Sequence, residues 1–150
     1  MWNAVIDGYF ETVKYNLTDE GGILHQAYRK SIPPIILKHV QDRFWTETTP
    51  EGESWKPLAQ FTVESKTRMG YQYIQNPGIL QATRNMYNSI DAIPIEGWGI
   101  SFGSDDPLAK KHQYGDIKLP ARPFLGWNNQ MEIDVQSKMQ SLVNEISSTL

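Results

Sequence analysis

Apolar residues near the N-terminus recur at steps of three and four positions, which is the period of one helical face. The face is formed by Trp2, Val5, Ile6, Tyr9, Phe10, Val13 and Leu17. Gly21 and Gly22 follow, and glycine commonly ends a helix. The pattern predicts an N-terminal helical arm over residues 1–22 and a single domain over residues 23–150. The arm packs either on its own domain or on a neighbouring subunit, and the spacing fits both.

Residues 24–31 continue a helical spacing as far as the proline pair Pro33-Pro34. A proline inside a helix costs on the order of 3 kcal/mol, whereas proline is favoured in the first turn after an N-cap such as Ser31. We therefore expect a break or kink here, and a helix from about residue 33 to residue 44 or 45. Its buried face would consist of Ile36, Val40 and Phe44.

Further along, the pattern changes to alternation, which is typical of strands. One apolar run covers residues 90–95, and a second places Trp98, Ile100 and Phe102 on one face. Residues 94–97 between the two runs fit a hairpin connection.

Glycines line the other face of the second run. Gly97, Gly99 and Gly103 do not have the spacing of a dinucleotide-binding loop, and no helix start follows in the way that such a loop needs. Dinucleotide binding is therefore rejected. A strand whose outer face is glycine lets another backbone approach closely, and in an oligomer that backbone could belong to a neighbouring subunit.

The C-terminal half predicts a short helix, a strand and a long helix. Ser104 to Pro107 is a helix-start signal, and the helix over residues 108–113 would end at Gly115. A strand is expected near residues 119–124. From Asn128 onward one apolar face of a long helix is expected to lie in the core, across a sheet. That face consists of Met131, Val135, Met139, Leu142, Val143, Ile146 and Leu150.

These elements predict an α+β fold. A small, mainly antiparallel sheet would pack against a helix in the N-terminal half and a long C-terminal helix. Residues 62–69 are expected to form a short polar helix, and residues 79–86 one or two helical turns. Asn76-Pro77-Gly78 between them is a turn signal.

A proline-rich corner, Leu119 to Trp127, is the most restricted stretch of the chain. Pro120 and Pro123 fix their own φ and push the preceding residues towards extended geometry, while Gly126 permits a conformation that other residues avoid. The guanidinium of Arg122 is therefore held by a stiff backbone, either as a clamp on carbonyls or a carboxylate of its own chain or as a bridge between subunits. The corner is typical of a docking or assembly element rather than a catalytic loop.

Other candidate residues have simpler interpretations. Trp55 lies in a polar loop over residues 46–57, and we expect it to fold that loop back onto the core rather than to bind a carbohydrate or a partner. His112 lacks companions for a metal site and an adjacent nucleophile, so a hydrogen-bonded role against the corner is expected. His39 is expected to be exposed and without a role. Asp105, Asp106 and Asp116 have positions that capping and turns explain.

Composition narrows the function. The chain has 150 residues, a formal net charge of -3 and no cysteine. The acidic balance argues weakly against a nucleic-acid reader, and the lack of cysteine excludes disulfides, thiolate catalysis and cysteine-based metal sites. No apolar run is long enough to span a bilayer, and the N-terminus has no signal-peptide pattern. We therefore expect a soluble intracellular domain.

Several blocks follow one another along the chain: Phe44, Thr49-Pro50-Glu51-Gly52-Glu53-Ser54-Trp55-Lys56-Pro57-Leu58, Thr62 to Lys66, Ile79 to Ile90, His112-Gln113-Tyr114-Gly115 and Leu119 to Trp127. In this order they resemble the phage virion morphogenesis (tail completion) family, which is typified by the G protein of phage Mu. They cover roughly residues 23–146. Leu108 stands where the family has tyrosine, and Arg84 where it has glycine, and we expect both departures to alter local packing only.

The resemblance implies a structural protein of the virion, assembled in the host cytoplasm, without a cofactor, a metal or an enzymatic activity. Such a protein is expected to form a ring, hexameric by this resemblance, at the head-proximal end of the tail or at the neck. Its partners would be the connector, the tail terminator or the tail tube, and DNA would pass through the ring without sequence-specific binding. The residues implied as the structural or interface motif are Trp55, Pro57, His112, Gly115, Pro120, Arg122, Pro123, Phe124, Leu125 and Gly126.

Two alternatives stay open. A tail terminator or a head-closure adaptor would share the fold and differ in the partner that it contacts. A small hydrolase or glycan-binding module built around the tyrosines and tryptophans belongs to another class, and no nucleophile–base pair or close carboxylate pair in the sequence supports it.

Overall fold

Three strands and four helices make up the part of the chain that the computed structural model describes, residues 9–57, 85–117 and 119–149. In chain order they are β1 (Tyr9–Lys14), α1 (Ile23–Thr46), α3 (Asn85–Ser89), β2 (Ile90–Pro94), β3 (Gly99–Ser104), α4 (Ala109–Tyr114) and α5 (Asn129–Thr149). The helix predicted at residues 62–69, the turn at residues 76–78 and most of the helical segment at 79–86 lie outside the described residues, as does the start of the predicted arm.

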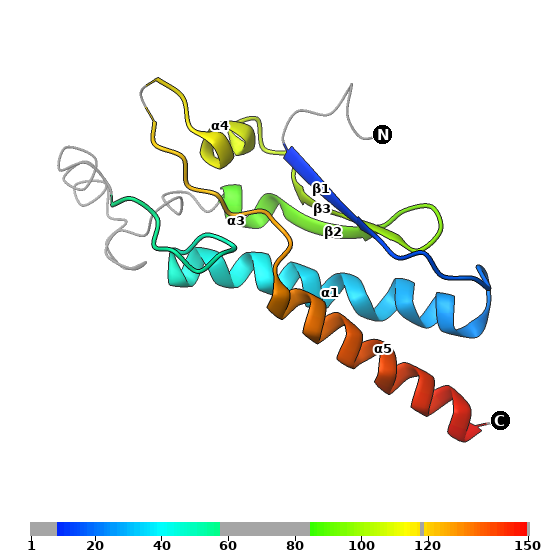
Figure 1. Ribbon diagram of the computed structural model, residues 1–150. Coiled ribbons are helices and arrows are strands. Elements are labelled where there is room, and N and C mark those ends of the chain that lie inside the picture. Colours follow the sequence, from blue (N-terminus) through cyan, green and yellow to red (C-terminus); the bar gives the residue numbers. More distant parts are fainter. Residues whose placement is uncertain (1–8, 58–84, 118, 150) are drawn as a thin grey trace.

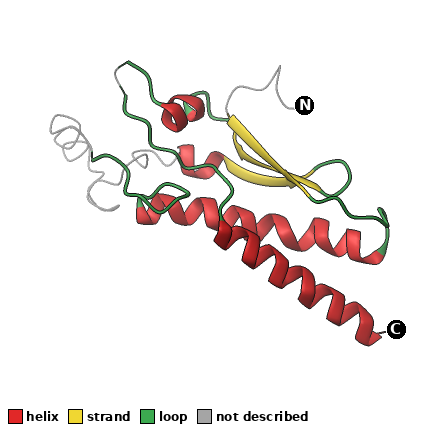
Figure 2. Cartoon of the chain, viewed as in Figure 1, coloured by secondary structure: helices red, strands yellow, loops and turns green. Residues whose placement is uncertain are grey.

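The strands form one antiparallel sheet in the order β1-β3-β2 (Figure 2). β2 and β3 are the predicted hairpin, and Ala92 lies opposite Phe102 in its register. β3 is the central strand, and Ile100 lies opposite Val13 of β1 on its other side. The predicted α+β class, with a small antiparallel sheet and a long C-terminal helix, is confirmed.

The helical arm predicted over residues 1–22 is wrong for its described part, because residues 9–14 are a strand and residues 15–22 are not helical. Apolar residues at 9, 10 and 13 fit a helical step, but the local pattern also alternates. Val13 and Tyr15 are half-buried and pack on the core, while Thr12 and Lys14, which alternate with them, are exposed. Aromatic and β-branched residues favour a strand, and the third strand of the sheet therefore comes from here.

Helix α1 is continuous from Ile23 to Thr46 and contains both prolines. The predicted helix at residues 33–45 is thus present, but the predicted break at its start is wrong. The prolines remove two backbone donors. Pro33 is itself buried, and Tyr28, Ile32 and Ile36 around it are fully buried. Helices in proteins draw most of their stability from such tertiary packing, which here outweighs the cost of the prolines.

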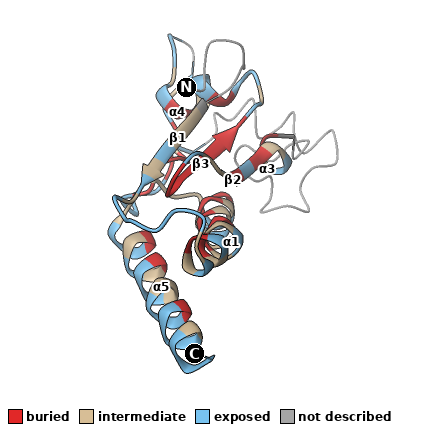
Figure 3. Ribbon diagram, turned by 90° about the vertical axis from the view of Figure 1, so that its right-hand side faces the viewer, coloured by how far each residue is buried: buried red, intermediate tan, exposed pale blue. Residues whose placement is uncertain are grey.

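The molecule is layered, with the sheet on one side of α1 and α5 on the other (Figures 1 and 3). α1 contacts β2, β3 and α5. The predicted apolar face of α5 is buried at Met131, Val135 and Leu142, but its principal contact is α1 rather than the sheet. No helix in the described ranges is long and apolar enough to cross a membrane.

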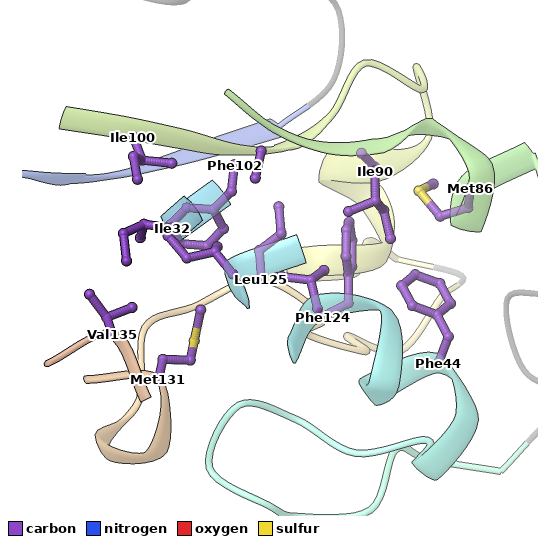
Figure 4. Packing of buried hydrophobic residues seen from close by; sticks show 14 of the residues in the cluster. Ile32, Phe44, Met86, Ile90, Ile100, Phe102, Phe124, Leu125, Met131 and Val135 are labelled. Atoms are coloured by element: carbon purple, nitrogen blue, oxygen red, sulfur yellow. The ribbon is translucent and has the colours of Figure 1, made fainter. Parts of the chain in front are cut away.

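The core lies between the sheet and the helices (Figure 4). Ile100 and Phe102 of β3 point towards Ile32 of α1, and Met131 and Val135 of α5 approach from the opposite side. All five side chains are almost completely buried. The predicted buried residues of α1, Ile36, Val40 and Phe44, are fully buried as well.

One turn of α1 fastens the β2–β3 hairpin through three side chains. The Tyr28 hydroxyl donates to the carbonyl of Trp98 at 2.8 Å, and Arg29 Nη1 donates to the carbonyl of Ile95 at 2.6 Å. The ring of His25 accepts the Gly21 N–H at Nδ1, so that its Nε2 carries the proton and donates to the Gly97 carbonyl at 2.6 Å. The carbonyls of Ile95 and Gly97 thereby gain side-chain donors, and the carbonyl of Trp98 also accepts the backbone N–H of Tyr15 at 3.2 Å.

We expect alkaline pH to weaken this packing through Tyr15 and Tyr28. Burial raises the pKa of both hydroxyls well above its ordinary value, and the carboxylate of Glu132, which accepts the Tyr15 hydroxyl, raises the pKa of Tyr15 further. In the unfolded chain tyrosine ionises near pH 10. The stabilisation is therefore complete below about pH 10 and is lost as the pH rises towards the higher pKa of the folded state.

The measurement is the free energy of unfolding in urea, from about pH 8 to pH 11. Above about pH 10 the free energy of unfolding of Tyr15→Phe should fall less steeply with pH than that of the wild type, because the variant lacks one of the two hydroxyls whose pKa is raised by folding. Tyr114→Phe, at a largely exposed position, is the control and should follow the wild type. Parallel curves for Tyr15→Phe and the wild type would contradict the assignment.

Candidate functional site

The proline-rich corner connects α4 to α5 and contains no strand (Figure 2). The strand predicted near residues 119–124 is therefore wrong. The segment is extended, as its prolines require, but Pro120 and Pro123 cannot donate to a sheet ladder. The other backbone N–H and C=O groups of the corner bond mainly to side chains. These side chains belong to α1, to the loop before residue 57, to α4 and to the turn after α4.

Gln113 of α4 supplies the central bonds. Its Oε1 accepts the backbone N–H groups of Phe124 and Leu125, at 3.1 and 3.0 Å, and its Nε2 donates to the carbonyl of Leu125 at 2.9 Å. The side chain is buried. Buried backbone groups without a partner are costly, so one amide satisfies three groups that the absent strand leaves open.

Three consecutive carbonyls of the corner each accept a side chain from a different segment. The indole Nε1 of Trp55 donates to Pro123 at 2.7 Å, Arg43 Nη1 of α1 donates to Phe124 at 2.8 Å, and Gln113 donates to Leu125. Burial lowers the pKa of Arg43 to about 10, and Glu51 opposes the shift, so Arg43 is charged at neutral pH. The predicted role of Trp55 in folding its loop onto the core is confirmed.

Arg122 is a clamp on carbonyls of its own chain. Its Nε donates to Lys56 at 2.9 Å and its Nη2 donates to Pro57 at 3.0 Å. Burial lowers the pKa of the guanidinium, and Glu47 opposes that effect. Of the two roles that the sequence left open, the intrachain clamp is the one seen. Pro57 contributes to the site through its carbonyl, which accepts the hydrogen bond from Arg122 Nη2.

The end of the corner is shaped by the loop over residues 47–57. Gly126 has a φ of 155°, and a Cβ there would lie 2.9 Å from the ring of Pro50. Asn128 donates to the carbonyl of Pro50 at 2.9 Å and accepts the N–H of Met131 at 2.8 Å. Asn128 is therefore the N-cap of α5, and it also anchors the loop.

Aromatic rings fill the space beneath the corner. Phe44 near the end of α1 makes edge contacts with Trp55, Tyr87 and Phe124, with ring centroids 5.5, 5.8 and 5.5 Å apart. Such pairs add about 0.5–1.5 kcal/mol each to the burial of their surface. Phe124 and Leu125 are thus held by packing as well as by hydrogen bonds (Figure 4).

Gly115 and His112 join α4 to the start of the corner. α4 ends at Gly115 as predicted, with a φ of 72°, and a Cβ there would lie 2.7 Å from the carbonyl oxygen of Leu119. The carbonyl of His112 accepts the N–H of Arg122 at 2.7 Å, which places the corner against α4. His39 differs from the prediction, because it is only half-exposed and pairs with Asp134 of α5 at 2.6 Å.

Within residues 9–57, 85–117 and 119–149, no group of three or more histidine and carboxylate side chains could hold a metal. His112 was the residue of the His-Gln-Tyr-Gly block that the sequence indicated, but Gln113 beside it is the buried residue that bonds the backbone of the corner.

A comparison with known families matches residues 17–144 to the phage virion morphogenesis family. The match spans most of the chain and includes every residue of the corner. The chain belongs to this family. The predicted resemblance is confirmed, and the role of the protein lies in phage virion assembly. A search of the curated proteins and of the solved structures found no match.

We expect Gln113→Leu to destabilise the fold strongly. The substitution leaves two N–H groups and one carbonyl of the corner unpaired, and each buried unpaired group costs about 1–3 kcal/mol. The free energy of unfolding, measured in urea, should fall by about 3 kcal/mol or more. Gln140→Leu, at an exposed position of α5, is the matched control and should stay within about 0.5 kcal/mol of the wild type. A loss below about 1 kcal/mol for Gln113→Leu would contradict the bonding scheme.

Phe124→Ala and Arg122→Ala test the corner as a structural element. Phe124→Ala removes a fully buried ring and should cost about 3–5 kcal/mol, whereas Arg122→Ala leaves two carbonyls without donors and should cost about 1–3 kcal/mol. Stability is read by thermal melting and assembly by completion of particles. Ile133→Ala, on the exposed side of α5, is the control. A corner variant with wild-type stability that still completes particles would show that the corner is dispensable.

Proposed function

We propose that the protein is a non-enzymatic structural component that completes the head-proximal end of a phage tail, or the neck, as a homo-oligomeric ring. The proposal is supported by the way in which the corner of this family member is bonded and packed within its own chain. The motif side chains Trp55, Arg122, Phe124 and Leu125 bond or pack against their own chain. They build a stiff fold instead of presenting groups to a substrate.

A ring suits this job because many copies of a modest contact together hold a particle. Each interface needs only a rigid surface with little ordering entropy left to lose, and such preorganisation strengthens association. The net charge of -3 fits a channel through which DNA slides, since an acidic wall repels phosphate. We propose a hexameric ring that contacts the connector, the tail terminator or the tail tube.

A tail terminator or head-closure adaptor is the nearest alternative, because the same ring would serve at a different boundary of the particle. The hydrolase or glycan-binding alternative has less support. Trp55 would be the aromatic platform of such a module, but its ring is buried and its N–H is bonded to Pro123.

The test is the mass of the purified protein by light scattering, alone and after addition to particles that lack it. We expect either a discrete ring in solution or a monomer that becomes a ring on the particle. Complete particles are the control, because their site would already be occupied and added protein should not bind. A monomer that never associates with incomplete particles would overturn the proposal and favour the enzyme or binding-module alternatives.

A further inference from the structure

Exposed apolar side chains flank α4, one just before its start and three at its end and in the turn after it. We call this surface the knob; it consists of Leu108, Tyr114, Ile117 and Leu119. Leu108 and Tyr114 are half exposed or more, and Ile117 is completely exposed. Large apolar side chains that gather on a protruding turn mark an interaction surface rather than a scattered exposure.

Two hydrogen bonds join Asp116 to Leu119, on either side of Ile117. The N–H of Asp116 donates to the carbonyl of Leu119 at 2.9 Å, and the carboxylate of Asp116 accepts the N–H of Leu119 at 2.8 Å. Gly115 packs so closely on this turn that no side chain fits there. The corner holds the base of the knob through Gln113. These bonds limit the freedom that Asp116 and Leu119 would lose on binding.

A groove lies on the face of the sheet turned away from α1. Phe10 of β1 and Asp91 of β2 lie opposite Gly103 of β3, one on each side of it in the register, so the three residues share this face of the sheet. Phe10 and Ile93 give the groove apolar walls, and its volume is about 720 Å³. Asp91 and Asp105 add carboxylates to its lining.

The knob and the groove are complementary in charge as well as in polarity. Lys110 and Lys111 are exposed on α4 beside the knob, whereas the groove carries two exposed aspartates. Ile117 does not fill the groove of its own chain, because its side chain is completely exposed. Two different, complementary surfaces on one chain make a head-to-tail contact between copies, and such a contact closes into a ring when its rotation permits.

We propose that the knob of one copy inserts Ile117 into the groove of the next copy, with Lys110 and Lys111 facing Asp91 and Asp105. This contact rests on the ring proposed above and names the surfaces that would form it.

Cysteine trapping tests the contact directly, because the chain has no cysteine of its own. Ile117→Cys and Ile93→Cys are purified separately, mixed, and oxidised with copper phenanthroline. The contact predicts a covalent dimer of one copy of each variant, separated by mass on a non-reducing gel. Ile133→Cys mixed with Ile93→Cys is the matched control and should give no such dimer, because Ile133 is an exposed isoleucine on α5.

The outcomes separate this proposal from the ring itself. If the mixture forms a ring by light scattering but no 117–93 link, the knob–groove contact is overturned and the ring stands. A link between two Ile117→Cys copies would also overturn it, because that contact would be two-fold. If the wild type never associates, both proposals fail. Ile117→Asp should abolish assembly while its circular dichroism stays native, and Ile133→Asp should preserve both.

Discussion

The hydrogen bonds between Gln113 and the corner are the constraint on which the rest of this structure depends. Pro120 and Pro123 have no backbone N–H, so this extended segment cannot pair with a neighbouring strand. Its remaining N–H and C=O groups therefore need other hydrogen-bond partners. One amide has both a donor and an acceptor, and it can therefore bond the N–H groups of Phe124 and Leu125 together with a carbonyl. No aliphatic or carboxylate side chain of this length offers both.

That constraint ties distant segments into one unit. α4 is a short helix, and short helices are marginal without tertiary support. The corner provides the support through Gln113 and through the carbonyl of His112, while Arg43 and Trp55 bring α1 and the loop over residues 47–57 to the same backbone. The first turn of α5 then starts from Asn128, which the same loop anchors. Because these bonds share one short backbone segment, we expect their contributions to be cooperative rather than additive.

The elements that could be predicted from the sequence are those whose residue pattern fits only one type of structure. The β2–β3 hairpin, the helix ended by Gly115 and the cap at Asn128 follow from local chemistry. It failed where tertiary contacts decide. Residues 9–14 fit both a helical and an alternating pattern, and pairing with β3 selects the strand. Pro33 and Pro34 predicted a break, and burial against the sheet overrides it. Gln113 was missed because a buried amide and an exposed one look the same in a sequence.

The side chains of the family motif differ from those proposed to contact a neighbour: the former bond within the chain, and the latter are exposed. The motif side chains bond inward, and several meet a backbone carbonyl, a contact that says nothing about what lies outside. Exposed side chains such as Ile117 and Ile93 meet solvent in the isolated chain and are free to differ without disturbing the corner. A fold built in this way can keep its stiffness while its surfaces change, since the stability resides in Gln113 and its partners. In the contact proposed above, specificity for a neighbour would depend on a few apolar and charged groups at the surface, and the corner beneath α4 would fix where the knob stands.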